Sequence, residues 1–198
     1  MHSPASPTDV ADESLLLRFA EGDMKAFESL YDRHEMGSWR FIFRSVRDRQ
    51  VADDLLQDVW FAVARQAAAY QPRAKFRTWL FTMARNRVVD HFRASRDMQS
   101  LDAHDDADGQ MASAFVAEPV ANSGFGPVRQ LESKQQALAL LEAIETLPQE
   151  QREAFLLQAE AGLGVADIAE ATGVSFETAK SRLRYARSHL RTLLWEFA

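Results

Sequence analysis

The stretch "VADIAEATGVSFETAKSRLRYARSHLRTLL", residues 165–194, decides the fold class. Apolar residues recur at steps of three and four along its second half, which predicts a helix that buries one stripe, made of Phe176, Ala179, Leu183, Ala186, Leu190 and Leu193. Ser175 is suited to cap this helix, and Glu177 lies in the first turn, where negative charge is favoured. Residues 165–174 predict a short helix that ends at Gly173, because glycine readily adopts a positive φ. Together these features indicate a helix-turn-helix.

The second of these helices collects positive charge in a chain whose formal net charge is −6. At about 100° per residue, four cations form a stripe beside the buried one: Lys180, Arg184, Arg187 and Arg191. Thr178, Ser181 and Tyr185 face roughly away from the core. In a helix-turn-helix the second helix lies in the major groove, where polar residues reach base edges and cations hold phosphates. A solvated amphipathic helix is the alternative for this charge pattern taken alone.

Composition excludes several classes of protein. The chain has 198 residues, 46% of them apolar, which allows one sizeable core or two small ones. It has no cysteine, so disulfides and thiolate metal sites are excluded. The N-terminus lacks the pattern of a signal peptide, and no apolar run is long enough to span a membrane. These features favour a cytoplasmic protein that is not inserted in a membrane, and no metal or other cofactor is expected.

Charge segregation predicts the domain organisation. Residues 97–127 carry six acidic residues and no Lys or Arg, among many Ala, Ser and Gly residues, which indicates a flexible acidic linker. No convincing strand alternation is present. We therefore expect an all-α chain with a disordered segment over 1–12, a small helical domain over 13–96, the linker over 97–133, and a second small helical domain over 134–194.

Within the first domain, apolar periodicity predicts five helical segments: 13–23, 24–34, 38–46, 51–68 and 75–96. The segment 51–68 keeps Asp53, Asp54 and Asp58 off its apolar stripe. The segment 75–96 is basic and aromatic, and Trp79 is expected in the core because Leu80, Met83 and Ala84 share its side.

Two parts of the chain resemble a known family. "ADDLLQDVWFAVAR" (52–65), followed by "YQPRAKFRTWLFTMARNRVVDHFR" (70–93), resembles region 2 of the extracytoplasmic-function (ECF) sigma factors of bacterial RNA polymerase. "LPQEQREAFLLQAEAGLGVADIAEATGVSFETAKSRLRYARSHLR" (147–191) resembles their region 4. The two motif blocks occur in the order of the family, around a variable linker. The resemblance implies a factor, not an enzyme, that binds core polymerase, directs it to promoters and helps to melt the −10 region.

The resemblance also implies which residues bind polymerase. The β′ clamp helices of the polymerase are expected to contact four residues of the acidic helix: Asp53, Asp54, Gln57 and Asp58. Carboxylates facing a basic partner would steer association and fix its register. From the residues alone, a favourable N-terminal helix turn is an equal alternative. A metal site is disfavoured because no His or further acid lies nearby at ligand spacing.

The basic helix and the loop before it are implied to hold the melted −10 element. The loop "AAAYQPRAK" (67–75) matches the one that cradles a flipped base, and Tyr70 is the candidate for stacking. The expected −10 contacts are Tyr70, Arg73, Lys75, Arg77, Asn86, Asp90 and Arg93.

In region 4 the recognition helix of the family reads the −35 element. The expected contacts are Thr178, Lys180, Ser181, Arg182, Arg184, Tyr185 and Arg187. Glu177, Ala179 and Tyr185 depart from the usual pattern, which affects the bases read more than the fold. The polymerase β flap and an anti-sigma factor are further implied partners. The alternative function is a two-domain helix-turn-helix regulator that is not associated with polymerase.

Overall fold

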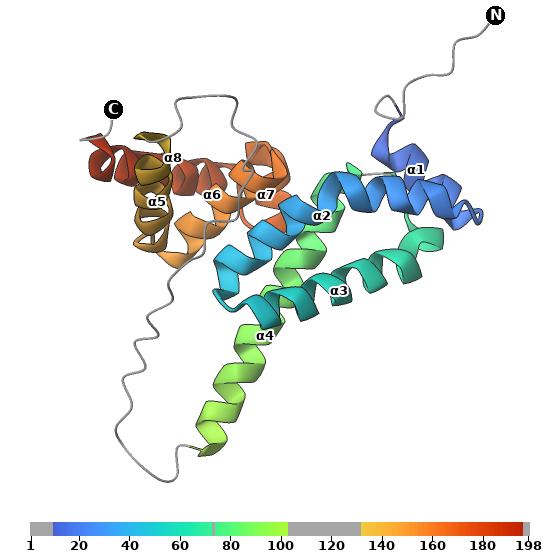
Figure 1. The fold of residues 1–198 in the computed structure, drawn as a ribbon, viewed down its shortest axis with the longest axis horizontal. Coiled ribbons are helices and arrows are strands. Elements are labelled where there is room, and N and C mark those ends of the chain that lie inside the picture. Colours follow the sequence, from blue (N-terminus) through green and yellow to red (C-terminus); the bar gives the residue numbers. More distant parts are fainter. Residues whose placement is uncertain (1–9, 73, 103–131, 196–198) are drawn as a thin grey trace, which may run out of the picture.

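The computed structural model describes residues 10–72, 74–102 and 132–195, with side chains described over 10–72, 74–96 and 136–195. This part of the chain consists of helices joined by short turns, without a strand (Figure 1). The helices are α1 Asp12–Ala20, α2 Met24–Val46, α3 Arg49–Gln66, the 3-10 turn η1 Ala67–Ala69, α4 Phe76–Asp102, α5 Glu132–Glu145, α6 Gln149–Ala161, α7 Val165–Thr172 and α8 Phe176–Leu193. The prediction of an all-α chain is confirmed.

The predicted helical segments differ from the structure at their ends. Segments 24–34 and 38–46 are parts of the single helix α2, which continues through Gly37. Helix α4 runs to Asp102, six residues into the predicted linker, because no Pro or Gly interrupts the chain there. Residues 1–9 and 103–131 lie outside the described residues, and the predictions of disorder and of a flexible linker there stay predictions.

Helices α1 to α4 share one core. Leu16, Leu30, Ile42, Val59 and Leu80 are all fully buried in it. Two side chains of α1 fix its position, because Asp12 pairs with Arg33 and His34 of α2, and Glu13 accepts a hydrogen bond of 2.8 Å from the backbone N–H of Phe76. Helix α1 thereby holds the first residue of α4.

Helices α7 and α8 form the predicted helix-turn-helix. Gly173 ends α7 with a φ of +67°, and the Ser175 hydroxyl accepts the N-capping hydrogen bond from the Thr178 N–H at 3.2 Å. Two members of the predicted buried stripe, Phe176 and Leu193, are instead 49% and 44% exposed. They are the first and last residues of α8.

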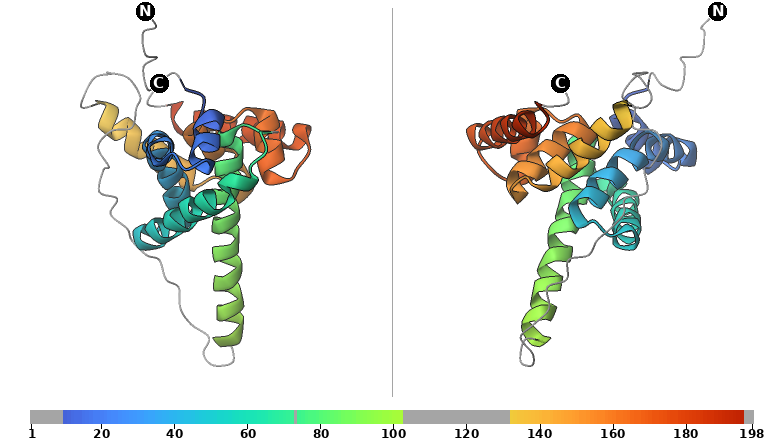
Figure 2. Two further views of the ribbon diagram at one scale, coloured as in Figure 1. Left: turned by 90° about the vertical axis from the view of Figure 1, so that its right-hand side faces the viewer. Right: turned by 60° about the vertical axis from the view of Figure 1, so that its left-hand side comes forward.

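The N-terminal and C-terminal helices pack against each other. Helix α6 contacts both α2 and α8, and α7 contacts both α4 and α8. Two further views show the C-terminal half of α4 extending away from all the other helices (Figure 2). The α2 and α4 surface is thus partly covered by α6 and α7, and the end of α4 is not.

Candidate functional site

The four residues predicted to contact polymerase lie together on α3. Asp53, Asp54, Gln57 and Asp58 are all exposed. The opposite side of the helix is anchored in the core by Ala52, Val59, Ala62 and Val63, which are almost completely buried. Because that apolar face fixes the rotation of α3, the carboxylates are held toward solvent.

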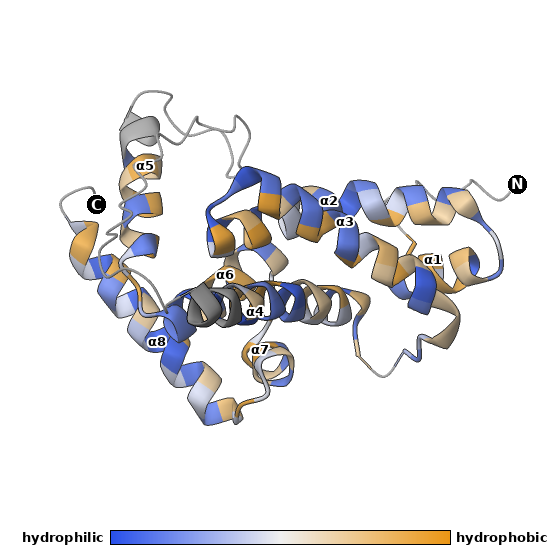
Figure 3. Cartoon of the chain, turned by 90° about the horizontal axis from the view of Figure 1, so that it is seen from below, coloured by the Kyte–Doolittle hydropathy of each residue, from blue (hydrophilic) through white to orange (hydrophobic). Residues whose placement is uncertain are grey.

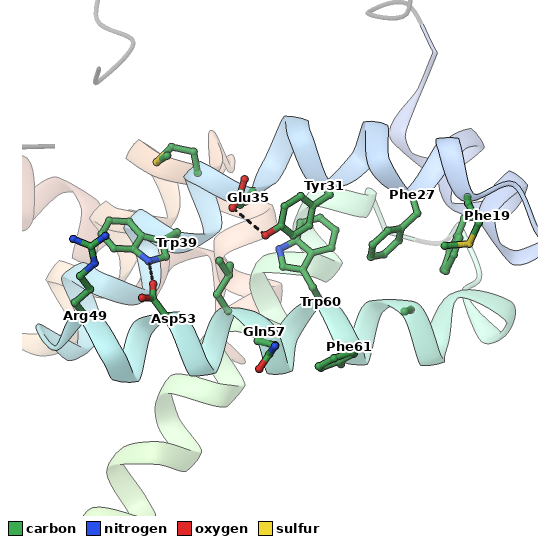
Figure 4. A pocket seen from close by; sticks show the side chains of 14 residues that line it. Phe19, Phe27, Tyr31, Glu35, Trp39, Arg49, Asp53, Gln57, Trp60 and Phe61 are labelled. Carbon is green, nitrogen blue, oxygen red and sulfur yellow. Dashed lines mark hydrogen bonds between the residues drawn. The ribbon is translucent and has the colours of Figure 1, made fainter. Parts of the chain in front are cut away.

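An open, mostly apolar groove of about 640 Å³ lies beside these acids, between α2 and α3. Figure 4 shows aromatic side chains from both helices along it, including Phe27, Tyr31, Trp39, Trp60 and Phe61. Asp53 and Gln57 also line the groove, so the predicted acidic surface continues into it. Sequence reasoning missed the groove. The sequence did carry one signal for it. Residues 19–61 contain more aromatic side chains than the buried stripe of a single helix can hold.

Polar groups in the groove are mostly paired. The Tyr31 hydroxyl donates to Glu35 Oε1 at 2.9 Å, and burial together with this carboxylate raises the pKa of Tyr31. The buried Trp60 indole N–H has no hydrogen-bond partner among the residues the structure describes. The groove therefore presents mainly apolar walls, with Asp53 and Gln57 at its edge.

The residues predicted to contact the −10 element fall into two groups. Asn86, Asp90 and Arg93 are exposed on successive turns of α4, with a 3.9 Å ion pair between Asp90 and Arg93. Lys75 and Arg77, at the start of α4, are also exposed but have partners in the C-terminal helices. Arg73 lies outside the described residues.

Tyr70 requires a correction. It is only 8% exposed, its hydroxyl donates to the Ala74 carbonyl at 2.7 Å, and its ring centroid lies 5.1 Å from that of Trp79. An enclosed ring has no free face on which a base can stack. In this arrangement Tyr70 instead stabilises the loop through its hydrogen bond to Ala74. Trp79 is partly buried against the core, as the sequence predicted.

The residues predicted to contact the −35 element are arranged along α8. Thr178, Lys180, Arg184, Tyr185 and Arg187 are exposed, while Ser181 and Arg182 are half-buried. Figure 3, which colours each residue by its hydropathy, shows that much of α8 is hydrophilic.

Neighbouring side chains hold three of the α8 residues. The Arg184 guanidinium carbon lies 4.8 Å from the ring centroid of Tyr185, and Arg184 also donates to the Tyr185 hydroxyl at 3.1 Å. Arg187 donates to Gln158 of α6 at 2.5 Å. These contacts orient both guanidinium groups on the exposed side of α8.

The described ranges contain no group of three or more His, Asp or Glu residues placed to hold a metal ion. None of their helices is both long enough and apolar enough to cross a membrane.

Comparison with known proteins identifies the class. Residues 30–97 match the model of sigma-70 region 2, and residues 137–190 match that of sigma-70 region 4. These two ranges are called region 2 and region 4 below. They contain α3 with most of α2 and α4, and the helix-turn-helix, so the exposed surfaces belong to a sigma-type chain.

Whole-chain relatives narrow this class. The RNA polymerase sigma factor CarQ of Myxococcus xanthus is 30% identical over 179 residues, covering 90% of this chain and 95% of that protein. The ECF RNA polymerase sigma factor SigM of Mycobacterium tuberculosis is 30% identical, with 93% and 85% covered. The chain belongs to the ECF sigma factors. It is an initiation factor that directs RNA polymerase to promoters.

Solved structures agree on the fold. CnrH in complex with the cytosolic domain of CnrY has a TM-score of 0.65 at 22% identity, covering 96% of this chain and 100% of that one. RpoE of Bartonella quintana, in complex with the anti-sigma factor NepR, has a TM-score of 0.64 at 23% identity, covering 86% and 97%.

Proposed function

We propose that this sigma factor binds core polymerase through α3 and the adjacent groove, holds the melted −10 element on α4, and reads the −35 element with α8. The observation that carries the proposal is the exposure of Asp53, Asp54, Gln57 and Asp58 beside an aromatic groove. Charged residues that border an apolar groove suit a protein partner that combines basic and apolar side chains.

The groove and the acidic residues would contribute differently to the binding of polymerase. A helix of the β′ clamp would bury apolar residues in the groove, which supplies binding energy. Asp54 and Asp58 lie one helical turn apart and would fix the register of the partner through complementary charge.

At the −10 element, α4 supplies polar groups suited to bases and phosphates. An asparagine amide can pair with the N6 and N7 atoms of adenine, and a carboxylate accepts from the cytosine N4 amine, which are the contacts available to Asn86 and Asp90. Arg93, with Lys75 and Arg77, would hold phosphates. Capture of unpaired bases in this way stabilises melted DNA.

At the −35 element, Arg184 is the residue suited to a guanine edge, with Thr178, Ser181 and Tyr185 around it. Lys180, Arg182 and Arg187 would hold phosphates on either side. Exposed Leu193 and Trp195, at the end of α8, are available to the β flap.

Restraint by an anti-sigma factor is also part of the proposal. It is supported by the similarity in fold to RpoE of Bartonella quintana, which was solved with an anti-sigma factor. Since an inhibitor that covered the α2–α3 groove would exclude polymerase, that groove is the expected contact. We further propose that the protein acts in the cytoplasm, in stoichiometric complex with polymerase, and catalyses no reaction of its own.

Transcription in vitro tests this function. Bacterial core polymerase with and without the purified chain is supplied with a genomic promoter library, and the transcript starts are sequenced. The proposal predicts starts that require the chain and share two upstream elements. A helix-turn-helix regulator would instead bind DNA without forming a stable complex with core polymerase in gel filtration.

A further inference from the structure

Helix α4 begins without a capping residue of its own. The first N–H groups of a helix have no partner within it, and a side-chain acceptor just before the helix usually satisfies one of them. Helices α2, α3 and α8 follow this rule, with side-chain caps from Asp23, Asp48 and Ser175. Before α4 stand Ala74 and Lys75, whose side chains accept no hydrogen bond. The local sequence therefore leaves the N-terminus of α4 uncapped.

A carboxylate from α1 takes the place of this cap. Glu13 Oε1 accepts a hydrogen bond of 2.8 Å from the backbone N–H of Phe76, the first residue of α4, across 63 positions of sequence. Negative charge at the N-terminus of a helix is also favoured by the helix dipole. Helix α1 thus supplies the acceptor and the charge that a local aspartate would otherwise provide.

The rest of α1 holds Glu13 in place. Leu16, about one turn further along the helix, is fully buried in the core. Asp12, the preceding residue, accepts from Arg33 at 2.8 Å and lies 2.7 Å from His34 Nε2, both on α2. Because the α1 backbone is fixed on both sides of Glu13, the carboxylate is held against the end of α4 before any partner binds.

The capped residue lies between two of the proposed −10 contacts. Phe76 follows Lys75 and precedes Arg77, and both of these cations are exposed. The Phe76 ring is fully buried, and its centroid lies 5.3 Å from that of the His34 ring. With the ring fixed in the core and the N–H fixed by Glu13, the backbone that carries the two cations has little freedom to move.

Helix α1 also contacts both ends of the loop before α4. It packs against the turn η1, where that loop begins, and against α4, where it ends. Burial raises the pKa of Tyr70 in this loop, and the charge of Glu13 adds to the effect. None of the polymerase or promoter contacts proposed above uses Asp12 or Glu13. Helix α1 ends before residue 30, where the match to region 2 begins.

We propose that Glu13 is a positioning residue for the −10 element: by capping α4 from α1, it holds Lys75, Arg77 and the loop before them in the arrangement that receives melted DNA. Glu13 acts through these groups and not by contact with DNA. A cap from another helix makes the order of the −10 surface depend on the docking of α1, whereas a local cap would order α4 alone. The inference rests on the proposed function of α4 at the −10 element, whereas the cap itself does not depend on it.

Amide hydrogen exchange in the free full-length chain, measured by NMR, tests the cap. In Glu13→Ala we expect the Phe76 N–H to exchange at least about fivefold faster than in the native chain, as the loss of one capping hydrogen bond predicts. Glu13→Gln keeps an acceptor oxygen and should retain part of the protection.

The matched control is Asp23→Ala, which removes the local carboxylate cap of α2. Asp23 accepts from the N–H groups of Lys25 and Ala26 and pairs with Arg18, and none of these residues belongs to the proposed binding surfaces. This variant should lose stability as a lost cap requires. The exchange of the Phe76 N–H, relative to that of the core amides, should stay as in the native chain.

Promoter opening tests the positioning role. Bacterial core polymerase is assembled with each chain on a promoter found by the transcription experiment above, and the reactivity of unpaired thymines with permanganate measures melting at −10. We expect Glu13→Ala to reduce opening by about fivefold, Glu13→Gln to lie between it and the native chain, and Asp23→Ala to open normally. The affinity for core polymerase should be equal in all four chains, because Glu13 does not line the α2–α3 groove. A merely structural role would lower opening and core binding together.

The cap is overturned if the Phe76 N–H exchanges equally fast in Glu13→Ala and in the native chain, or if Asp23→Ala accelerates it to the same extent. The positioning role is overturned if Glu13→Ala loses this protection but opens promoters as the native chain does. Failure of the proposed function has a different signature. The native chain itself would then open no promoter with core polymerase, which removes the −10 role of Glu13, while the exchange measurements still decide the cap.

Discussion

The indole N–H of Trp39 on α2 donates a hydrogen bond of 2.6 Å to the Asp53 carboxylate on α3. The Trp39 ring also stacks on Phe43, with centroids 4.9 Å apart and planes 7° apart. One of the four residues proposed to contact polymerase is therefore oriented by a neighbouring helix before any partner arrives. The same bond ties the two walls of the groove together at one end.

Trp39→Phe should weaken the binding of core polymerase. The substitution keeps an aromatic wall but leaves Asp53 without its donor, and a hydrogen bond of this kind is worth about 1 kcal/mol, or roughly fivefold in Kd. Competition binding with a labelled sigma chain measures the effect. In a double-mutant cycle, Trp39→Phe should cost little in an Asp53→Ala background, because alanine has already removed the carboxylate that Trp39 orients. Fully additive losses would show that the two residues act independently.

Reversal of charge on α3 should have a larger effect. Asp54→Lys with Asp58→Lys places two cations against a basic partner, and we expect core polymerase binding to fall by at least about tenfold. Glu28→Lys with Asp32→Lys is the matched control, since these acids are also exposed and one turn apart, but on α2 and away from the groove. Equal losses in both pairs would point to net charge and not to a polymerase contact.

On α8, two kinds of arginine should behave differently. Arg184→Ala should lose roughly 1–3 kcal/mol of discrimination at one or two −35 positions, because a base edge loses its bidentate partner. Arg187→Ala should weaken binding evenly across sequences and reduce the slope of log K against log salt by about one. Binding of holoenzyme to a randomised −35 library at several salt concentrations separates the two. A uniform loss for Arg184→Ala would contradict its assignment as a base reader.

The contact between α1 and α2 should make stability depend on pH. Burial alone would raise the pKa of Asp12, but hydrogen bonds and charges from His34 and Arg33 outweigh it and lower the pKa from 3.8 to about 2. A lowered folded-state pKa contributes stability above the unfolded value, and the contribution is lost as pH falls toward about 2. Asp12→Asn should therefore cost about 2 kcal/mol at pH 7, with the difference from the native chain narrowing between about pH 5 and 2. Urea unfolding across this range provides the measurement, and a constant difference would contradict the role of Asp12.

The sequence by itself determined the features that are local in the chain. The helix-turn-helix follows from an apolar period, a glycine and a capping serine, all within residues 165–190. The exposure of Asp53, Asp54 and Asp58 follows from the apolar residues between them, which must face the core. Such signals are complete in one segment, because helix periodicity and capping involve residues only a few positions apart.

Only the tertiary structure decided how distant segments meet. Glu160 reaches Arg40 across 120 positions of sequence, and the groove needs aromatic residues from three helices. The position of Tyr70 in a loop predicted a residue that stacks on a base, yet its ring is enclosed because Trp79 packs against it. Gly37 predicted a break between two helices, but α2 continues through it, and α6 occupies the space that a side chain there would fill. These outcomes depend on which surfaces are buried together, and burial is a property of the assembled helices that no single segment encodes.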